Sequence, residues 1–372
     1  MLMVCSLPPP VHGQSVVNAA MCRRLSDDAT VCDIGPAGRS GPAYHLTRLR
    51  RVVAALARVV TARGGAVYFS SEAGWGVLYL LALAAAARLA RVREMYLHHH
   101  VYGYIHAPGP GHRLLLAVAG PACRHILLSE RMEADFRRRF GARHDTLVVH
   151  NAPFIDAALR RGPSGAGAAG PAATTTLGFI GRLDDAKGFD VFLALVEAFA
   201  ADPKVRFVVA GDTATSPLAD AVERARTRVG DRLTLMGFVD GPTKTAFFEG
   251  IDVLVFPSKY ANEASPLVCY EAMAMGVAVL ATDVGAVTDL VTEECGAVVG
   301  RDTPLVPAFA ALLRELVADP ARRHRWQVGA RARFERLERR ADAALTNLRA
   351  GVASPPDGRP SAPHRRHSSA AA

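Results

Sequence analysis

The chain has 372 residues, half of them hydrophobic, which is enough for two domains that each bury a core. Its net charge is +9, and the residues from Arg322 onward contribute +8 through twelve Arg and four Asp or Glu residues, so the nearly neutral remainder argues against nucleic-acid binding by the core. The longest apolar run begins at Val77 and is interrupted by Arg88, well short of the roughly 20 residues that span a bilayer.

The first residues, MLMVCSLPPP, contain no basic segment and reach three prolines too early for a signal peptide, which predicts a cytoplasmic protein. The six cysteines form no Cys-x-x-Cys pair. Buried reduced thiols are therefore expected rather than disulfides or structural zinc.

In the first half of the chain, apolar runs alternate with helical patterns. MLMVCS, GAVYFS, EMYLHHH, HILLS and TLVVHN predict strands, and residues 44–63 and 74–91 predict helices between them. Gly13 follows the first strand and predicts a tight turn without a side chain. The segment 161–175 is rich in Gly, Pro and small residues and predicts a linker, so the first domain is expected to cover residues 1–160.

The second half repeats the pattern over residues 176–330, with strands predicted at TLGFIGR, VRFVVAG, LTLMGF, DVLVFPS, VAVLATD and GAVVG. Such continuous Val, Leu and Ile runs are typical of parallel strands buried on both faces. A final helix is expected over 331–352, followed by a disordered tail over 353–372. The fold class is therefore α/β with two parallel sheets, whose ligands bind beyond the carboxyl ends of the strands.

The segment 256–285 contains a predicted strand end followed by a helix start. Ser265 is expected to be the N-cap and Pro266 the first helical residue. The backbone N–H groups of Leu267 and Val268 would then point out of the helix, where an anion binds favourably.

Two glutamates flank this helix start. Glu263 lies in the preceding loop, and Glu271 follows after seven intervening residues, inside an otherwise apolar helix. A buried carboxylate needs hydrogen-bond donors, and the hydroxyl groups of a ligand would supply them. The pair therefore indicates two acceptors for a polyol on either side of a phosphate site.

Several segments together resemble a known family. NEASPLVCYEAMAMGVAVLATDVGAVTDLV resembles the Glu-x7-Glu signature of retaining glycosyltransferases of family 4, and GFIGRLDDAKGFDVFLALVEAF is similar to that family's Gly-Arg-Leu…Lys-Gly stretch. The segments SLPPPVHGQSVVN, YLHHHVYGYI and LSERMEADFRRRFG extend the resemblance to roughly residues 3–335. It implies the GT-B fold, in which two doubly wound Rossmann-like domains face each other across a cleft.

The resemblance also implies a reaction and a division of labour. A hexosyl unit passes from a nucleotide-diphosphate sugar to an acceptor hydroxyl with retention of configuration. The N-terminal domain binds the acceptor and the C-terminal domain binds the donor. Glu263 is expected to bind the donor sugar and Glu271 the ribose of its nucleotide.

Arg182 and Lys187 follow a predicted strand, near a helix start. Two cations at a strand end suit a diphosphate, although a solvated charged loop is an alternative explanation. The resemblance implies the same role, the stabilisation of the departing nucleotide diphosphate. Many family members have two glycines in the loop after the first strand, whereas this chain has His12 and Gly13. The sequence therefore does not determine how closely that loop approaches the donor phosphate.

Other strand ends supply the remaining candidate residues. The resemblance implies that Gly237 and Phe238 contact the base, with Phe238 as a core residue the alternative. Three histidines, 98 to 100, end a strand, with His98 and His100 on one face and His99 on the other. The family often places one histidine near the reacting sugar, and we choose His100 for that role.

No metal or cofactor is expected, because the chain contains no Asp-x-Asp and no G-x-G-x-x-G after its first strand. The expected partners are the nucleotide-diphosphate sugar and a saccharide or lipid-linked acceptor. The basic C-terminal segment either contacts the anionic inner face of the membrane or is a solvated helix and tail. Two alternatives to a transferase remain, a non-catalytic nucleotide-sugar-binding GT-B protein and a GT-B nucleotide-sugar epimerase.

Overall fold

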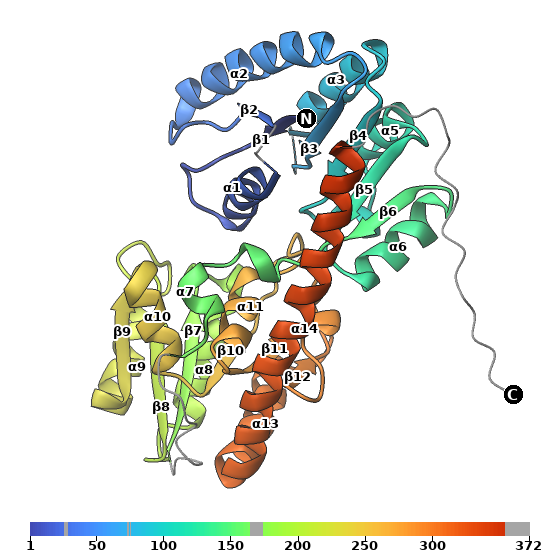
Figure 1. The fold of residues 1–372 in the computed structure, drawn as a ribbon. Coiled ribbons are helices and arrows are strands. Elements are labelled where there is room, and N and C mark those ends of the chain that lie inside the picture. The colour runs from blue at the N-terminus through green and yellow to red at the C-terminus, as the bar shows by residue number, and fades with distance from the viewer. Residues whose placement is uncertain (26–28, 73, 75, 164–173, 354–372) are drawn as a thin grey trace, which may run out of the picture.

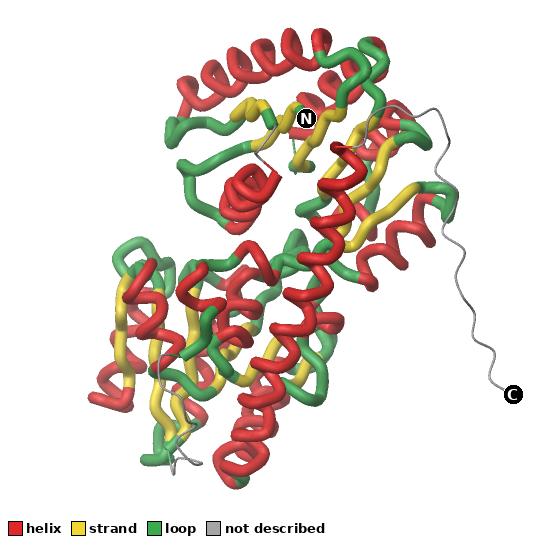
Figure 2. Tube along the Cα trace, in the orientation of Figure 1, coloured by secondary structure: helices red, strands yellow, loops and turns green. Residues whose placement is uncertain are grey.

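The computed structural model describes residues 1–25, 29–72, 74, 76–163 and 174–353, and for residues 351–353 it describes the backbone alone. It contains two α/β domains, one above the other in Figure 1. Each domain is built on a sheet of six parallel strands. Helices cover both faces of the sheets (Figure 2). The prediction of two parallel α/β sheets is therefore confirmed.

The N-terminal sheet has the strand order β2-β1-β3-β4-β5-β6. Its strands are β1 (Leu2–Cys5), β2 (Thr30–Asp33), β3 (Ala66–Ser70), β4 (Glu94–His98), β5 (Cys123–Leu127) and β6 (Asp145–Val148). Its helices are α1 (Gly13–Leu25), α2 (Gly41–Thr61), α3 (Gly76–Leu89), α4 (Gly103–His106), α5 (Pro110–Ala119) and α6 (Glu130–Phe140). The central strands are buried on both faces because helices pack on both sides.

Two short helices, η2 (Ala152–Phe154) and α7 (Ala157–Arg160), follow β6. The C-terminal sheet then has the order β12-β11-β10-β7-β8-β9, with strands β7 (Thr175–Ile180), β8 (Val205–Ala210), β9 (Leu233–Gly237), β10 (Val253–Phe256), β11 (Ala278–Thr282) and β12 (Gly296–Val299). Its helical segments are η3 (Asp185–Lys187), α8 (Phe189–Ala198), α9 (Ala219–Val229), η4 (Gly230–Arg232), α10 (Gly241–Glu249), α11 (Leu267–Ala274), α12 (Val287–Leu290) and α13 (Leu305–Ala318).

Each sheet reverses its strand order at one point, between β1 and β3 in the first sheet and between β7 and β10 in the second. Ligands of open parallel sheets bind beyond the carboxyl ends of the strands at such a point. The loops that follow β1, β7 and β10 are therefore where a ligand is expected.

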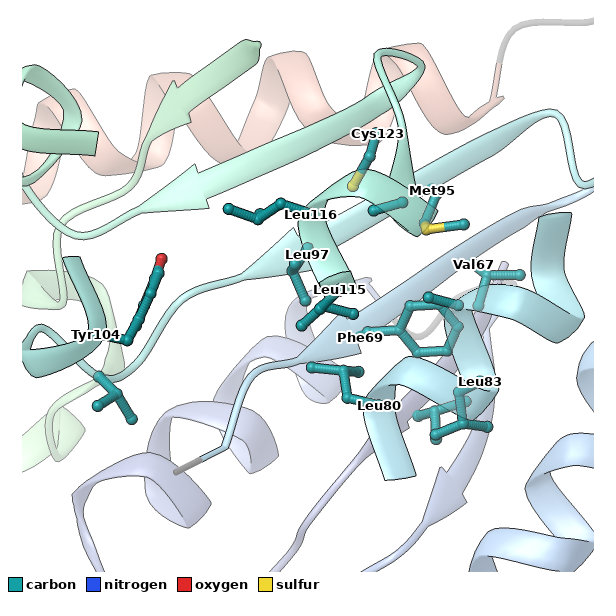
Figure 3. Packing of buried hydrophobic residues seen from close by; sticks show 14 of the residues in the cluster. Val67, Phe69, Leu80, Leu83, Met95, Leu97, Tyr104, Leu115, Leu116 and Cys123 are labelled. Atoms are coloured by element: carbon teal, nitrogen blue, oxygen red, sulfur yellow. The ribbon is translucent and has the colours of Figure 1, made fainter. Parts of the chain in front are cut away.

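Apolar side chains from the strands and covering helices form separate cores in the two domains. Figure 3 shows part of the N-terminal core, in which β3, β4, α3 and α5 contribute Val67, Phe69, Leu97, Leu80 and Leu115. In the C-terminal domain, Phe179, Phe189, Phe192 and Phe207 pack in one cluster between the sheet and α8. Burial of these large side chains is the main favourable contribution to folding.

The last helix, α14 (Pro320–Ala353), contacts both domains. It begins at Pro320, earlier than the expected residue 331, because a proline fits the first turn of a helix, where no N–H donor is needed. Along its length in Figure 1 it passes from the C-terminal domain to the N-terminal domain. Trp326, Phe334 and Leu337 join clusters of the C-terminal domain, and Ala341, Leu345 and Leu348 pack with residues of β1 and α1.

The observed helices α2 and α3 begin and end within three residues of the predicted helices over 44–63 and 74–91. Most of the expected linker, residues 164–173, and the expected tail from residue 354 lie outside the described residues. Among the described helices, none combines the length and the apolar character needed to cross a bilayer.

Candidate functional site

One cavity of about 600 Å³ lies between the two domains. From the N-terminal domain it is lined by the loop after β1, with Val11, His12 and Gly13. From the C-terminal domain it is lined by the segments after β7, β8, β9 and β10 and by the start of α11. The cavity therefore contacts the reversal point of the second sheet, as the topology leads one to expect.

The start of α11 lies against the loop that contains Gly13. A Cβ added to Gly13 would lie 3.8 Å from Cδ1 of Leu267, across the domain boundary. The first amides of α11 have no partners within the helix, and both Leu267 and Val268 line the cavity. The arrangement provides N–H donors and a favourable helix dipole for an anion.

The expected N-cap is wrong by one residue. The helix begins at Leu267, and Pro266 is the cap residue with φ −67° and ψ 121°. Ser265 is buried behind it, where its Oγ lies 3.0 Å from the hydroxyl of Tyr270 and its carbonyl accepts a hydrogen bond of 3.0 Å from Nδ2 of Asn151. The extended ψ of Pro266 excludes it from the helix, so Ser265 is too far back to cap α11. Ser265 is therefore not in the cavity lining and contacts Tyr270 and Asn151 instead, whereas Pro266 lines the cavity.

Glu263 lies in the cavity and is paired with Lys187, whose Nζ is 2.5 Å from Oε2 of the carboxylate. The ammonium group also lies 4.9 Å from the centre of the Tyr260 ring, at cation–π distance. The backbone at Glu263 is held closely by Gly285, which has φ +55°. A Cβ there would lie 2.2 Å from the Glu263 carbonyl oxygen, so only glycine fits.

Glu271 is 6% exposed, and its Oε1 lies 2.9 Å from Nζ of Lys244. Lys244 lies on α10, which begins after the Asp240 capping box, and the lysine also lines the cavity. The sequence analysis missed Lys244. Two signals in the sequence could have identified it. Lys244 lies about one turn into a helix that directly follows the strand end expected to contact the base, and a buried carboxylate such as that of Glu271 needs a cationic partner.

Arg182 lines the cavity and forms an ion pair of 3.2 Å with Asp184. Asp184 in turn caps η3, accepting a hydrogen bond of 2.9 Å from the backbone N–H of Lys187. The Arg182 side chain is 65% exposed, as the solvated-loop alternative holds, and both Arg182 and Lys187 also line the cavity. All three cationic side chains of the lining, on Arg182, Lys187 and Lys244, are paired with a carboxylate.

Phe238 is 75% exposed and lines the cavity, so the core alternative for this residue is wrong. Gly237 precedes it with φ +69°, a conformation that turns the chain sharply at the end of β9. Asp212 lines the same end of the cavity from the loop after β8. Its carboxylate accepts hydrogen bonds of 2.9 Å from the Ala214 N–H and the Thr215 hydroxyl, which fix that loop.

The three consecutive histidines, including the chosen His100, are not among the residues that line the cavity. His98 is buried, with its Nδ1 2.6 Å from the Tyr68 hydroxyl oxygen. The centres of the His98 and His100 rings are 4.0 Å apart, with the rings tilted by 46°, so both lie on one face of the sheet as alternation predicts. His99 points the other way, toward His125 at 3.0 Å. The histidine that lines the cavity is His12, from the loop after β1.

His100 is held by its backbone N–H, which donates a hydrogen bond of 3.0 Å to Oγ of Ser71. Burial, and secondarily the nearby His12, lowers the pKa of His100 to about 3. Burial also lowers the pKa of His12, against an opposing effect of Glu72. Both imidazoles are therefore neutral near pH 7 and can serve as hydrogen-bond donors or acceptors without adding charge.

Residues 174–319 match the family model described as glycosyl transferases group 1. The chain is 34% identical over 163 residues to a D-inositol 3-phosphate glycosyltransferase of Xylanimonas cellulosilytica, covering 43% of this chain and 38% of the relative. It is 33% identical over 147 residues to the lipopolysaccharide core biosynthesis mannosyltransferase LpsB of Rhizobium meliloti, covering 37% of this chain and 41% of the relative. The matches thus span less than half the length of these curated relatives.

Solved structures resemble the chain over nearly its full length. The HepE protein of Anabaena in complex with UDP has a TM-score of 0.70 at 18% identity, covering 94% of this chain and 99% of HepE. The sucrose-phosphate synthase of Thermosynechococcus elongatus has a TM-score of 0.68 at 19% identity, covering 93% and 96%. The chain therefore has the GT-B fold of two Rossmann-like domains, with a C-terminal domain that matches the glycosyl transferases group 1 family.

Proposed function

We propose that this chain is a retaining glycosyltransferase of family 4 that transfers a hexosyl unit from a nucleotide-diphosphate sugar to an acceptor hydroxyl. The observation that supports it best is the composition of the interdomain cavity. Its lining contains five carboxylates and three cations beside a helix start, and the groups that the proposal uses are on Glu263, Glu271, Arg182, Lys187, Lys244 and Leu267. A sugar, a ribose and a diphosphate need these groups in this combination.

Each group has a role in the proposed reaction. Arg182, Lys187 and the amides at the start of α11 bind the diphosphate and stabilise the charge that develops on it as the glycosidic bond breaks. The Glu263 carboxylate accepts hydrogen bonds from the donor sugar, and Glu271 accepts them from the ribose. The exposed ring of Phe238 stacks on the base.

The proposed transfer takes place on one face of the sugar. The acceptor oxygen bonds to the anomeric carbon on the face from which the diphosphate departs, and the acceptor proton passes to an oxygen of the leaving phosphate. Retention follows from this same-face attack. Arg182, Lys187 and the amides at the start of α11 provide the electrostatic stabilisation that a divalent metal would otherwise give, so the proposed reaction is metal-independent.

Each of the two domains binds one of the two substrates. In the proposal, residues 176–330 bind the donor, since most of the cavity lining lies there, and residues 1–160 bind a saccharide or lipid-linked acceptor. HepE was solved in complexes with UDP and UDP-glucose, so uridine diphosphate sugars are the first donors to test. LpsB is a lipopolysaccharide core biosynthesis mannosyltransferase, which favours an acceptor used in cell-surface polysaccharide or glycolipid synthesis, at the cytoplasmic face of the membrane.

The test is incubation with a panel of nucleotide sugars, with and without candidate acceptors, followed by measurement of released nucleotide and of the anomeric configuration of the product. Acceptor-dependent nucleotide release with retention supports the proposal. If a nucleotide sugar binds but is not turned over with any of the acceptors, the result would favour the alternative of a non-catalytic nucleotide-sugar-binding protein. A changed sugar configuration in the absence of an acceptor would favour the epimerase.

A further inference from the structure

Helix α2 presents a row of large apolar side chains to solvent. Leu46, Leu49, Val53 and Val60 are 50%, 51%, 56% and 58% exposed. Their spacing of three, four and seven residues places them on one side of the helix. Val52, Ala55 and Val59 are buried in the core and lie about a third of a turn round the helix from the row, so the row borders the buried side and is open to solvent. Figure 1 shows α2 along the outer edge of the N-terminal domain, on the far side from the C-terminal domain.

The charge around the apolar row has one sign. The segment Gly41–Thr61 contains no Asp or Glu. Arg50 lies beside the row and is exposed, and Arg39 and Arg63 are exposed next to the two ends of the helix. In the part of the chain that the structure describes, these three arginines take part in no ion pair. An apolar face with cationic flanks is typical of helices that lie in the interface of an anionic bilayer.

The other basic helix of the chain is less suited to this role. On α14, Arg331 is paired with Glu335, Arg336 with Glu294, and Arg340 with Glu130. Arg333 donates to the carbonyl of Asp289. Most of the positive charge of the described part of α14 is thus used within the protein, and its apolar residues are directed to the two cores.

The buried side of α2 reaches the loop that leads into the cavity. Arg48 is paired with Glu72, which accepts a hydrogen bond from the Ser6 hydroxyl at the start of that loop. Arg51 is paired with Asp33, and Asp33 also accepts a hydrogen bond of 3.1 Å from the Leu7 N–H. The helix therefore connects an outward apolar row with the segment that ends at His12 and Gly13.

We propose that α2 docks the enzyme on an anionic lipid surface, with Leu46, Leu49, Val53 and Val60 inserted among the lipids and Arg39, Arg50 and Arg63 against the headgroups. This inference rests on the proposed function in one respect, since it identifies a membrane as the place where the acceptor is met. It moves the membrane contact from the basic C-terminal segment to α2. The matching partner chemistry is an anionic phospholipid bilayer, because both the apolar and the cationic groups of the surface then have counterparts.

The test is co-sedimentation of the full chain with vesicles of phosphatidylcholine containing zero, 20 or 40 per cent phosphatidylglycerol. The double variant L49E/V53E places two negative charges in the apolar row. Val328→Glu is its matched control, because Val328 is 57% exposed on α14 beside the C-terminal domain. Wild type and Val328→Glu should bind more tightly as the anionic fraction rises and less tightly as salt rises, whereas L49E/V53E should need at least about tenfold more lipid. Arg339→Glu, on α14, should bind as wild type does.

Equal binding of wild type and L49E/V53E would overturn the inference, as would equal binding to neutral and anionic vesicles. A wild-type dimer that L49E/V53E dissociates, without vesicle binding, would instead identify the row as an interface between copies. Circular dichroism and thermal unfolding of the variants verify that they are folded. Calorimetry with a nucleotide diphosphate separates the two proposals, because wild type that binds nucleotide but no vesicles refutes only the docking, and the converse refutes only the donor site.

Discussion

Replacement of Glu271 by alanine tests the assignment of the ribose contact. In the structure, Oε1 of Glu271 is 2.9 Å from Lys244, which leaves Oε2 for a ribose hydroxyl. A hydrogen bond to a charged group contributes about 1.5–3 kcal/mol. A loss of about 2 kcal/mol corresponds to a dissociation constant roughly 30-fold higher, so we expect Glu271→Ala to weaken binding of uridine diphosphate by about this factor.

The sharpest measurement is isothermal titration calorimetry with the nucleotide and with its 2′,3′-dideoxy analogue, on wild type and Glu271→Ala. If the carboxylate binds the ribose, the deoxy analogue should bind both proteins about equally, and the variant should discriminate little between the two ligands. Lys244→Met is the companion variant, because it removes the cation that orients Glu271 while it leaves the carboxylate in place. An equal loss of affinity for both ligands in Glu271→Ala would show that this glutamate does not contact the ribose.

Three further predictions concern charge and protonation. Arg182→Ala and Lys187→Ala should each lower kcat/KM by about 30- to 900-fold, the equivalent of about 2–4 kcal/mol of transition-state stabilisation, and near-wild-type values in initial-rate kinetics would contradict their role at the diphosphate. Transfer should continue after dialysis against EDTA, so activity restored only by added Mn²⁺ or Mg²⁺ would disprove the metal-independent reaction. Burial lowers the pKa of His98, His99, His100 and His125, so below about pH 6.5 the unfolded chain binds protons that the folded chain does not. The free energy of unfolding should therefore fall by up to about 1.4 kcal/mol per histidine per pH unit toward pH 4, and a urea midpoint that stays constant from pH 7.5 to 5 would refute this.

The sequence was most informative where function depends on residues that are close along the chain. The apolar runs predicted both sheets but missed the edge strand β2. The spacing of Glu263 and Glu271 around a helix start predicted two of the carboxylates that the cavity contains. The partner of Glu271 could not be found in this way, because Lys244 reaches it through the packing of α10 beside α11. The same limit applied to Phe238, whose exposure depends on a gap between two domains.

Two local predictions were also limited by geometry. The helix start is displaced by one residue because the backbone angles of Pro266 are not helical, which a sequence pattern does not reveal. The choice of His100 rested on the family resemblance. Strand alternation correctly placed His98 and His100 on one face, but it does not say how far each ring lies from the other domain. The contact of His12 with the cavity follows from the course of the loop after β1.

The bridging helix α14 also has a consequence for the order of synthesis. Ala341, Leu345 and Leu348 pack on Met3, Val17 and Met21, residues that leave the ribosome roughly 300 positions earlier. At about 5–20 residues per second, β1 and α1 wait roughly 15–60 s for these partners. During that interval the nascent N-terminal domain exposes the apolar surface that α14 later covers, even if its sheet is already formed. A ribosome stalled before residue 341 should therefore hold an N-terminal domain that is more sensitive to protease and more strongly bound by chaperones than the same domain in the finished chain.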